Sequence, residues 1–248
     1  MSEFDFDVVG VTETWLHPDT ASDCFQIPGY SLLRSDTKTT VTHRAGGGVA
    51  MYIKEDILHE PYTIVDVVDP GIEHLCVVLK VKGVRIGLCV IYRPPHLRYS
   101  CLTALFRSLF VDLAVEVKSV LCMGDTNIDL STDLSNDAKF MSRLLRELNT
   151  VQIINEPTRV TANSATLLDH IIVDRSTEVK RIGVIDAPSL TDHKDKSISD
   201  HRLVFCDLAC KIDKPGPQLI TYRDFSKFNQ EEAIRRIAEV DWDSAMLI

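Results

Sequence analysis

The sequence has no apolar run that approaches the roughly 20 residues of a membrane-spanning helix. Its first ten residues, MSEFDFDVVG, lack the basic start and the long apolar stretch of a secretory signal peptide. The seven cysteines include no Cys-x-x-Cys spacing, and their odd number argues against a disulfide framework. These absences predict an intracellular protein that is not secreted and does not span a membrane. Its thiols should be reduced and largely buried, without a cysteine-based metal site.

An excess of positive charge is also absent. The chain carries 27 Lys and Arg against 36 Asp and Glu, which gives a net charge of −9. That balance argues against a protein that grips nucleic acid mainly by bulk electrostatics. It is compatible with an enzyme whose acidic side chains surround a metal. The length of 248 residues and the 45% of hydrophobic residues fit one large domain or two small ones.

Many short apolar runs and few helical patterns follow one another along the chain. This mixture predicts a layered α/β domain over residues 1–210. Residues 211–248 read as a linker over 211–218 and an amphipathic helix over 228–242, with Asn229 as its N-cap. Strands are expected at 8–15, 46–53, 75–92 (two strands joined by a turn at Lys82-Gly83), 119–125, 168–173, 180–185 and 203–208, and helices at 100–117 and 137–149.

Polar side chains gather where the predicted strands begin or end. In a layered sheet such ends can converge on one cleft. Carboxylate oxygens favour Mg²⁺ or Mn²⁺, which suits phosphodiester hydrolysis. One carboxylate could position the attacking water, and Asp169 could orient and charge His201. The candidate residues are Glu13, Tyr92, Arg93, Asp125, Asn127, Asp169, Asp200 and His201.

Each of these residues also has an ordinary explanation. Glu13 could be a surface residue, and GDTN at 124–127 could be a simple turn, because Gly, Asp and Asn all suit turns. A further Asp-His pair, Asp192-His193, is set aside because no strand follows it directly. His170 is expected to pack or bond locally beside Asp169. The ordered set therefore carries the hypothesis, and no single member does.

The ordered set resembles the endonuclease/exonuclease/phosphatase superfamily. The motifs TETW, GDTN, LLDHIIV and SDH occur in that order within residues 5–208. The resemblance implies a deoxyribonuclease I-like four-layer α/β sandwich, with two packed mixed β-sheets flanked by helices. The phrases GGGVAMYI, VIYRPP, EPTRVT and SDHRLVF are similar to the apurinic-type endonuclease domain of LINE-type (non-LTR) retrotransposons. The tail resembles the segment that leads from that domain to a reverse transcriptase, which the sequence itself lacks.

The resemblance also implies a role for each matching residue. Members of the superfamily begin with a strand that carries a metal-side Asn, and this strand has no counterpart here, so an exposed sheet edge and weaker activity are expected. The implied roles are metal binding by Glu13 and Asp200, contact with the scissile phosphate by Tyr92, water activation by Asp125 with Asn127, phosphate binding by His201 with Asp169, and substrate contacts by Arg93 and by Thr166 near the DNA minor groove.

The function predicted from these observations is a monomeric endonuclease dependent on Mg²⁺ (or Mn²⁺). It would nick DNA, leave a 3′-hydroxyl and a 5′-phosphate, need no cofactor besides the metal, and work in the nucleus. Two alternatives stay open. One is another phosphodiesterase of the superfamily, acting on phosphoinositides or sphingolipids. The other is an inactive relic that serves at most as a binding module. The phrases YRPP and PTR favour the retrotransposon branch.

Overall fold

The computed structural model describes residues 5–36, 47–64, 68–186, 199–210 and 229–240. Contacts divide the chain into two compact units, Met1–Ile212 and Asp213–Ile248. The expected linker at 211–218 and the pair Asp192-His193 lie outside the described residues. Within the described residues, no helix has the length and apolar character needed to cross a membrane.

A six-stranded sheet forms the centre of the first unit. Only β6 and β7 run parallel, and every other neighbouring pair is antiparallel. The predicted turn at Lys82-Gly83 is confirmed: Val81 pairs with Val84, and both turn residues adopt positive φ, as a tight two-residue hairpin requires. The order of the strands is β4 (Leu58–Pro61), β5 (Glu73–Val81), β6 (Val84–Tyr92), β7 (Ser119–Asp125), β11 (Asp169–Asp174) and β8 (Thr150–Gln152).

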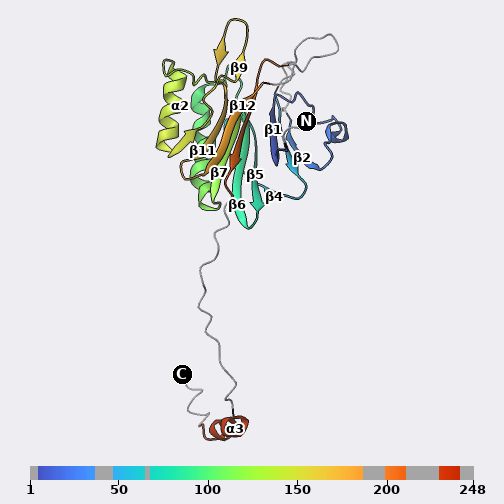
Figure 1. Cartoon of the computed structure of the whole chain (residues 1–248), viewed down its shortest axis with the longest axis vertical. Coiled ribbons are helices and arrows are strands. Elements are labelled where there is room, and N and C mark those ends of the chain that lie inside the picture. Colours follow the sequence, from blue (N-terminus) through green and yellow to red (C-terminus); the bar gives the residue numbers. More distant parts are fainter. Residues whose placement is uncertain (1–4, 37–46, 65–67, 187–198, 211–228, 241–248) are drawn as a thin grey trace. The chain divides into compact units, whose positions relative to one another are not determined.

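Further strands pack on one face of this sheet, so the fold is an α/β sandwich (Figure 1). Gly10 of β1 lets the two layers approach closely, because a Cβ there would lie 2.6 Å from a methyl of Val90. The sequence predicted two mixed sheets, but the described strands of this layer form two antiparallel pieces. The only described crossover between parallel neighbours is the helical one from β6 to β7. The pieces are β1 (Val8–Thr12), β3 (Val49–Lys54) and β2 (Tyr30–Ser35), then β12 (Val179–Ile185) and β13 (Leu203–Leu208).

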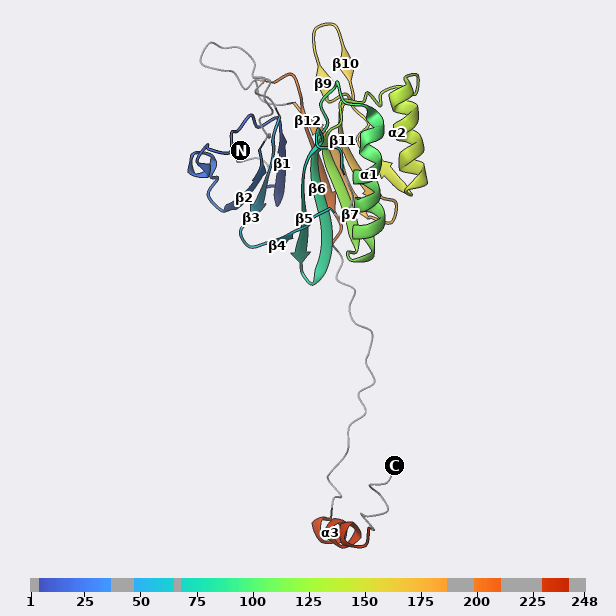
Figure 2. The ribbon, with the colours of Figure 1, turned by 180° about the vertical axis from the view of Figure 1, so that it is seen from behind.

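Helices cover the opposite face of the six-stranded sheet (Figure 2). The helix predicted at 100–117 begins as α1 (Leu102–Arg107) and continues through a π turn and a 3-10 turn to Val115. The helix predicted at 137–149 is α2 (Asn136–Glu147), and the hydroxyl of Ser135 caps it by accepting from the Ala138 N–H at 3.0 Å. A 3-10 turn, Ser22–Phe25, lies on the outer side of β3, where the Tyr52 hydroxyl donates to the Phe25 carbonyl.

A short hairpin, β9 (Arg159–Val160) and β10 (Ala165–Thr166), extends beyond the end of the sandwich (Figure 1). In the second unit, α3 (Gln230–Ala238) begins after Asn229, whose side chain accepts from the Glu232 N–H at 3.1 Å. The N-cap predicted for Asn229 is therefore confirmed.

The seven cysteines are free. Cys76, Cys89 and Cys122 are buried side by side on β5, β6 and β7, and burial raises the pKa of the Cys89 thiol. Cys101, Cys206 and Cys210 are partly buried. Cys24 is exposed, so the prediction of buried thiols does not hold for that residue.

His170 of β11 faces the helix-covered side of the sheet and is buried. One ring nitrogen is 3.0 Å from the Thr126 hydroxyl, and the other is 3.2 Å from the Leu167 carbonyl. Burial lowers the pKa of His170 to about 4. The neutral imidazole therefore connects β11 to the loop that follows β7.

This burial predicts a loss of stability in mild acid. A folded-state pKa below the ordinary value of about 6.5 means that the neutral ring stabilises the fold fully above pH 6.5, and that this contribution is lost as the pH falls towards 4. Between pH 7.5 and pH 5, His170 should account for about 2 kcal/mol of lost unfolding free energy. Asp125 and His201, whose pKa values are raised, change stability in the opposite direction, so urea unfolding should show the loss as a difference: from pH 7.5 to pH 5 the unfolding free energy should change by about 2 kcal/mol less favourably in the parent than in His170→Gln.

His96→Gln is the matched control, because His96 is exposed. It should keep the pH dependence of the parent. Equal pH dependence in the parent and in His170→Gln would show that His170 does not titrate with unfolding.

Candidate active site

The strand register places four polar side chains in one lateral row. Glu73 pairs with Tyr92, Tyr92 with Asp125, and Asp125 with Asp169, across β5, β6, β7 and β11. Cross-strand neighbours project from the same face of a sheet. Val90 and Ile171, two positions before Tyr92 and two after Asp169, lie in the core against the second layer of strands. The row therefore lies at the end of that core.

The loop after β7 fixes the Asp125 carboxylate. Gly124 has φ +137, and a Cβ there would fall 1.9 Å from the Ile91 carbonyl oxygen, so only glycine allows β6 and β7 to pair at this point. The backbone N–H of Asn127 donates to Asp125 Oδ1 at 2.7 Å, and its side-chain amide donates to Asp125 Oδ2 at 3.2 Å. The same amide donates to the Arg93 carbonyl at 3.0 Å, so Asn127 ties Asp125 to the end of β6.

Asp125 is 4% exposed, and this burial raises its pKa to about 7. The neighbouring Asp169 carboxylate adds to the rise, and the Asn127 N–H and His201 oppose it. A carboxyl group with this pKa can gain or lose a proton near neutral pH.

His201 bonds to Asp169, the Asp-His partnership that the sequence suggested. Its Nδ1 lies 2.8 Å from Asp169 Oδ2, and this bond raises the pKa of His201. The imidazole thus favours its protonated form, with Nε2 left on the other side of the ring. Asp200 Oδ1 lies 3.9 Å from that Nε2.

Thr158 holds this side of the site together. Its buried hydroxyl accepts from the backbone N–H groups of Leu168 at 3.1 Å and Asp169 at 3.0 Å. Its carbonyl accepts from the Arg202 N–H at 2.7 Å, and its own N–H donates to the Thr166 carbonyl at 2.9 Å. One residue therefore joins β11, the segment with His201, and the β9–β10 hairpin.

Asp200, which the sequence predicted to bind metal, forms a salt bridge with the Arg159 side chain in this structure. Its Oδ2 accepts from Arg159 Nε at 2.8 Å, and its side chain is 43% exposed. Thr166 lies directly opposite Arg159 in the hairpin. The base of the hairpin therefore borders the site on the side of Asp200.

Glu13 reaches the row from the other layer. It follows β1 in a left-handed conformation, with φ +51. The Tyr92 hydroxyl bonds to its carboxylate, and burial, followed by this bond, raises the pKa of Tyr92 well above its usual range. Tyr92 is therefore a neutral hydroxyl at physiological pH.

Glu73 is a member of the row that the sequence reasoning missed. Its carboxylate accepts from the Gly48 N–H, and a Cβ on Gly47 would meet its oxygens. Gly47 and Gly48 in turn accept from the N–H groups of Trp15 and Thr14, at 2.8 and 3.2 Å. Glu73 thus anchors the turn that carries Glu13. Counting back from the turn at Lys82-Gly83 would have placed Glu73 opposite Tyr92.

Arg93 has a different position from the substrate contact that the sequence suggested. It follows Tyr92 directly, so its side chain leaves the opposite face of the strand, and it is 2% exposed. Its Nη1 donates to the Thr126 carbonyl at 2.7 Å, whereas its Nε has no hydrogen-bond partner. This geometry makes Arg93 a support for the loop that holds Asp125.

The side chains of the site suit a hard divalent cation. One oxygen of Asp125, one oxygen of Asp169 and a ring nitrogen of His201 lie within 4.8 Å of one another, and the two carboxylates remain available to a cation when His201 is protonated. The pKa of Asp125 is raised first by burial and then by the neighbouring Asp169 carboxylate, so a cation between the two carboxylates would offset their repulsion. Oxygen donors in this charge state are those that Mg²⁺ and Mn²⁺ prefer.

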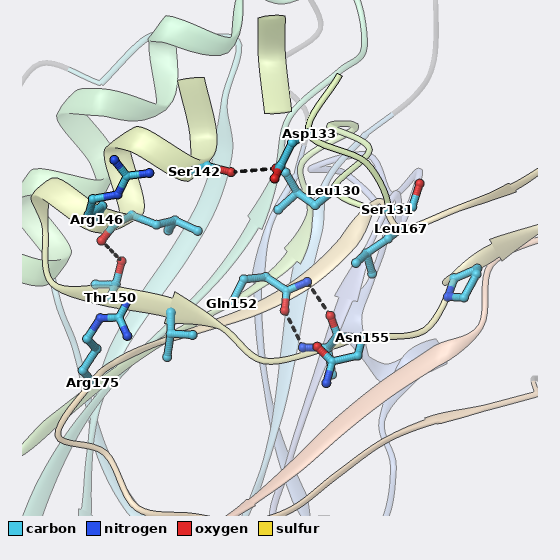
Figure 3. A pocket seen from close by; sticks show the side chains of 14 residues that line it. Leu130, Ser131, Asp133, Ser142, Arg146, Thr150, Gln152, Asn155, Leu167 and Arg175 are labelled. Carbon is cyan, nitrogen blue, oxygen red and sulfur yellow. Dashed lines mark hydrogen bonds between the residues drawn. The ribbon is translucent and has the colours of Figure 1, made fainter. Parts of the chain in front are cut away.

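A pocket of about 610 Å³ lies elsewhere, between α2, β8 and the loop after β7 (Figure 3). None of the predicted site residues lines it. Ser142 donates to Asp133 at 3.4 Å, Thr150 donates to the Leu145 carbonyl at 3.0 Å, and Gln152 bonds both backbone groups of Ile154. These polar groups serve the local structure, so the row remains the candidate site.

Comparisons with known proteins agree with the fold. The profile of the endonuclease/exonuclease/phosphatase family matches residues 1–201. The endonuclease domain of TRAS1, a telomere-specific non-LTR retrotransposon, is 14% identical with a TM-score of 0.57, over 76% of this chain and 83% of that one. TDP2 from D. rerio, complexed with a single-strand DNA product, is 14% identical with a TM-score of 0.53, over 81% and 84%.

A family protein from Bacteroides thetaiotaomicron is 18% identical with a TM-score of 0.54, over 82% of this chain and 81% of that one. At these identities the solved structures establish a shared fold alone. The search of curated proteins found no match.

The anchoring role of Glu73 is testable without any assay of activity. In Glu73→Ala the Gly48 N–H loses its acceptor, which typically costs about 1–3 kcal/mol. The turn at 13–15 should then open more often, so hydrogen exchange at the Thr14 and Trp15 amides should accelerate by about tenfold or more. Glu73→Gln keeps an acceptor oxygen and should have a smaller effect.

Glu60→Ala serves as the control, because Glu60 lies on β4 and pairs with Lys80 and Arg85. Unchanged exchange at Thr14 and Trp15 in Glu73→Ala would rule out the anchoring role.

Proposed function

The chain belongs to the endonuclease/exonuclease/phosphatase family, a family of hydrolytic nucleases and phosphatases, and on that premise we propose that it is a divalent-metal-dependent DNA endonuclease. It hydrolyses one phosphodiester bond and leaves a 3′-hydroxyl and a 5′-phosphate. The observation that carries the proposal is the joined unit of Asp125, Asp169 and His201 at one end of the sheet.

Asp125 is the general base in this proposal. Asn127 holds both of its carboxylate oxygens, so the group is oriented before a substrate arrives. With a pKa of about 7, the ionised form is available near neutral pH and is basic enough to take a proton from the attacking water. Bound cations would lower this pKa and increase the ionised fraction.

His201 stabilises charge on the phosphate. Asp169 holds the Nδ1–H, and the raised pKa favours the protonated ring, whose Nε2–H can donate to a non-bridging oxygen. Tyr92 can supply a second, neutral donor once its hydroxyl, which stays protonated, turns from Glu13 to the phosphate. The His201 donor is preorganised by its bond to Asp169 and needs little reorganisation during the reaction.

Glu13 and Asp200 are the residues we assign to Mg²⁺ or Mn²⁺. When bound, such an ion offsets negative charge on the phosphate and on the leaving oxygen. Arg159 bonds Asp200 through Oδ2 and competes with this role at that oxygen, whereas Oδ1 is not bonded to Arg159. Arg93 acts on the site through the loop 125–127.

The assignment of DNA as the substrate, and of a retrotransposon origin, rests on short sequence motifs. The motifs TETW, YRPP, PTR and SDH support this branch, and Thr166 at the base of the hairpin is the residue assigned to the DNA groove. Action as a monomer in the nucleus belongs to the same proposal.

Nicking of supercoiled plasmid tests the proposal. The purified protein should relax the plasmid with Mg²⁺ or Mn²⁺ and fail with EDTA. Asp125→Asn and His201→Ala should each slow nicking by about 10²–10³-fold, because each removes a group that acts in the transition state. Glu13→Gln should raise the Mg²⁺ concentration needed for half-maximal rate. His96→Ala, at an exposed position outside the row, is the control and should nick like the parent.

Folded protein that fails to nick with either cation would support the inactive relic instead. Hydrolysis of phosphoinositides or sphingomyelin without nicking would favour the other phosphodiesterase class.

A further inference from the structure

Trp15 is an exposed aromatic side chain next to the candidate site. Its side chain is 62% exposed, and Phe25 is the only other aromatic among the exposed large hydrophobic side chains of the described residues. A large indole left in water forgoes the stabilisation that its burial would provide. Single exposed apolar residues are common, so exposure alone assigns no role to Trp15.

The surrounding contacts hold Trp15 in a defined position. Its backbone has φ +56, a conformation that costs free energy in a residue other than glycine. Its N–H donates to the Gly47 carbonyl at 2.8 Å, and its indole Nε1–H donates to the Glu13 carboxylate at 3.3 Å. One edge of the ring is therefore fixed, and much of its surface remains open to solvent.

The fixed edge places the ring beside the reactive groups. Glu13, which holds the indole, is also bonded to the Tyr92 hydroxyl, and Tyr92 is the lateral neighbour of Asp125. The Glu13 side chain thus connects the indole to Tyr92 of the row. A phosphodiester bound at Asp125 and His201 would bring its adjoining nucleoside towards this ring.

Stacking of a nucleobase on Trp15 is a better source of affinity for nucleic acid in this protein than its overall charge. The net charge of −9 weakens attraction between the whole chain and a polyanion. Stacking of a base on an aromatic ring tolerates any sequence and contributes strongly to the binding of single strands. It requires a base with a free face, however, and bases within an intact duplex are stacked on both sides.

We propose that Trp15 stacks on an unpaired nucleobase next to the scissile phosphate, and that the preferred substrate is DNA with an unpaired nucleotide at the cleavage position. The inference rests on the proposed nuclease function and refines its substrate class. Trp15 is then a substrate-binding residue, and its bond to Glu13 couples base binding to the metal side of the site.

Fluorescence tests binding without cleavage. The sequence has two tryptophans, so Trp242→Phe leaves Trp15 as the only one. In EDTA, an oligonucleotide duplex with a central unpaired bubble should quench this emission, and the fully paired duplex should quench it less at the same concentration. Trp15→Phe, which retains Trp242, should lose the difference between the two oligonucleotides. Equal or absent quenching in the Trp242→Phe protein would overturn the proposal.

Kinetics with Mg²⁺ separates stacking from a structural role. Trp15→Ala should raise KM for bubble DNA by about 5- to 150-fold relative to its effect on bis(4-nitrophenyl) phosphate, which carries no base. Trp15→Phe loses the bond to Glu13 but keeps a ring, so it should recover most of the affinity for bubble DNA. Phe25→Ala removes an exposed aromatic outside the row and is the matched control.

Two kinetic results would refute the role of Trp15. One is an unchanged KM for bubble DNA in Trp15→Ala. The other is an equal loss on bubble DNA and on the small phosphodiester, which would mean that Trp15 only supports Glu13. If the parent protein cleaves no DNA but bubble DNA still quenches Trp15 selectively, the nicking proposal fails and the stacking proposal stands.

Discussion

The pairing register of β5, β6, β7 and β11 is the constraint on which the candidate site depends. It brings Glu73, Tyr92, Asp125 and Asp169 to the same level and the same face. A slip of one residue would turn any of these side chains into the helix-covered core, where an unpaired carboxylate is costly. The two-residue turn at Lys82-Gly83 fixes the first pairing, and the close approach at Gly124 fixes the second.

This concentration of carboxylates is destabilising unless other groups compensate for it. Asn127 donates two hydrogen bonds to Asp125, His201 donates to Asp169, and the Gly48 N–H donates to Glu73. Three of the five described non-glycine residues with positive φ, namely Glu13, Trp15 and Asn127, are at or beside the row. Backbone strain and incompletely compensated charge thus occur together, as expected where a binding site takes precedence over stability.

Local patterns predicted most of the fold, because strands, turns and caps leave short-range signals. The turn at Lys82-Gly83 and the cap at Asn229 are examples. Features set by distant contacts were harder to predict. Glu73 looks like an ordinary first residue of a strand. Arg93 follows Tyr92 directly, so only the alternation of side chains along the strand sends the two to opposite faces of the sheet. The bond between Asp200 and Arg159 depends on how the β9–β10 hairpin meets the separate segment that carries Asp200. The division of the second layer into two pieces also has no short-range signal.

The two Asp-His pairs show that the direction in which a side chain points, and not the residue type alone, decides whether it belongs to the site. In the first pair, Asp169 faces the row and His170 faces the buried helix side, because successive strand residues alternate between faces. In the second pair, His201 turns inward to Asp169, and Asp200 turns to Arg159 at the rim. The carboxylate of one pair therefore charges the imidazole of the other. His170 does not take part in that pair, and its neutral ring instead bonds Thr126 in the loop that follows Asp125.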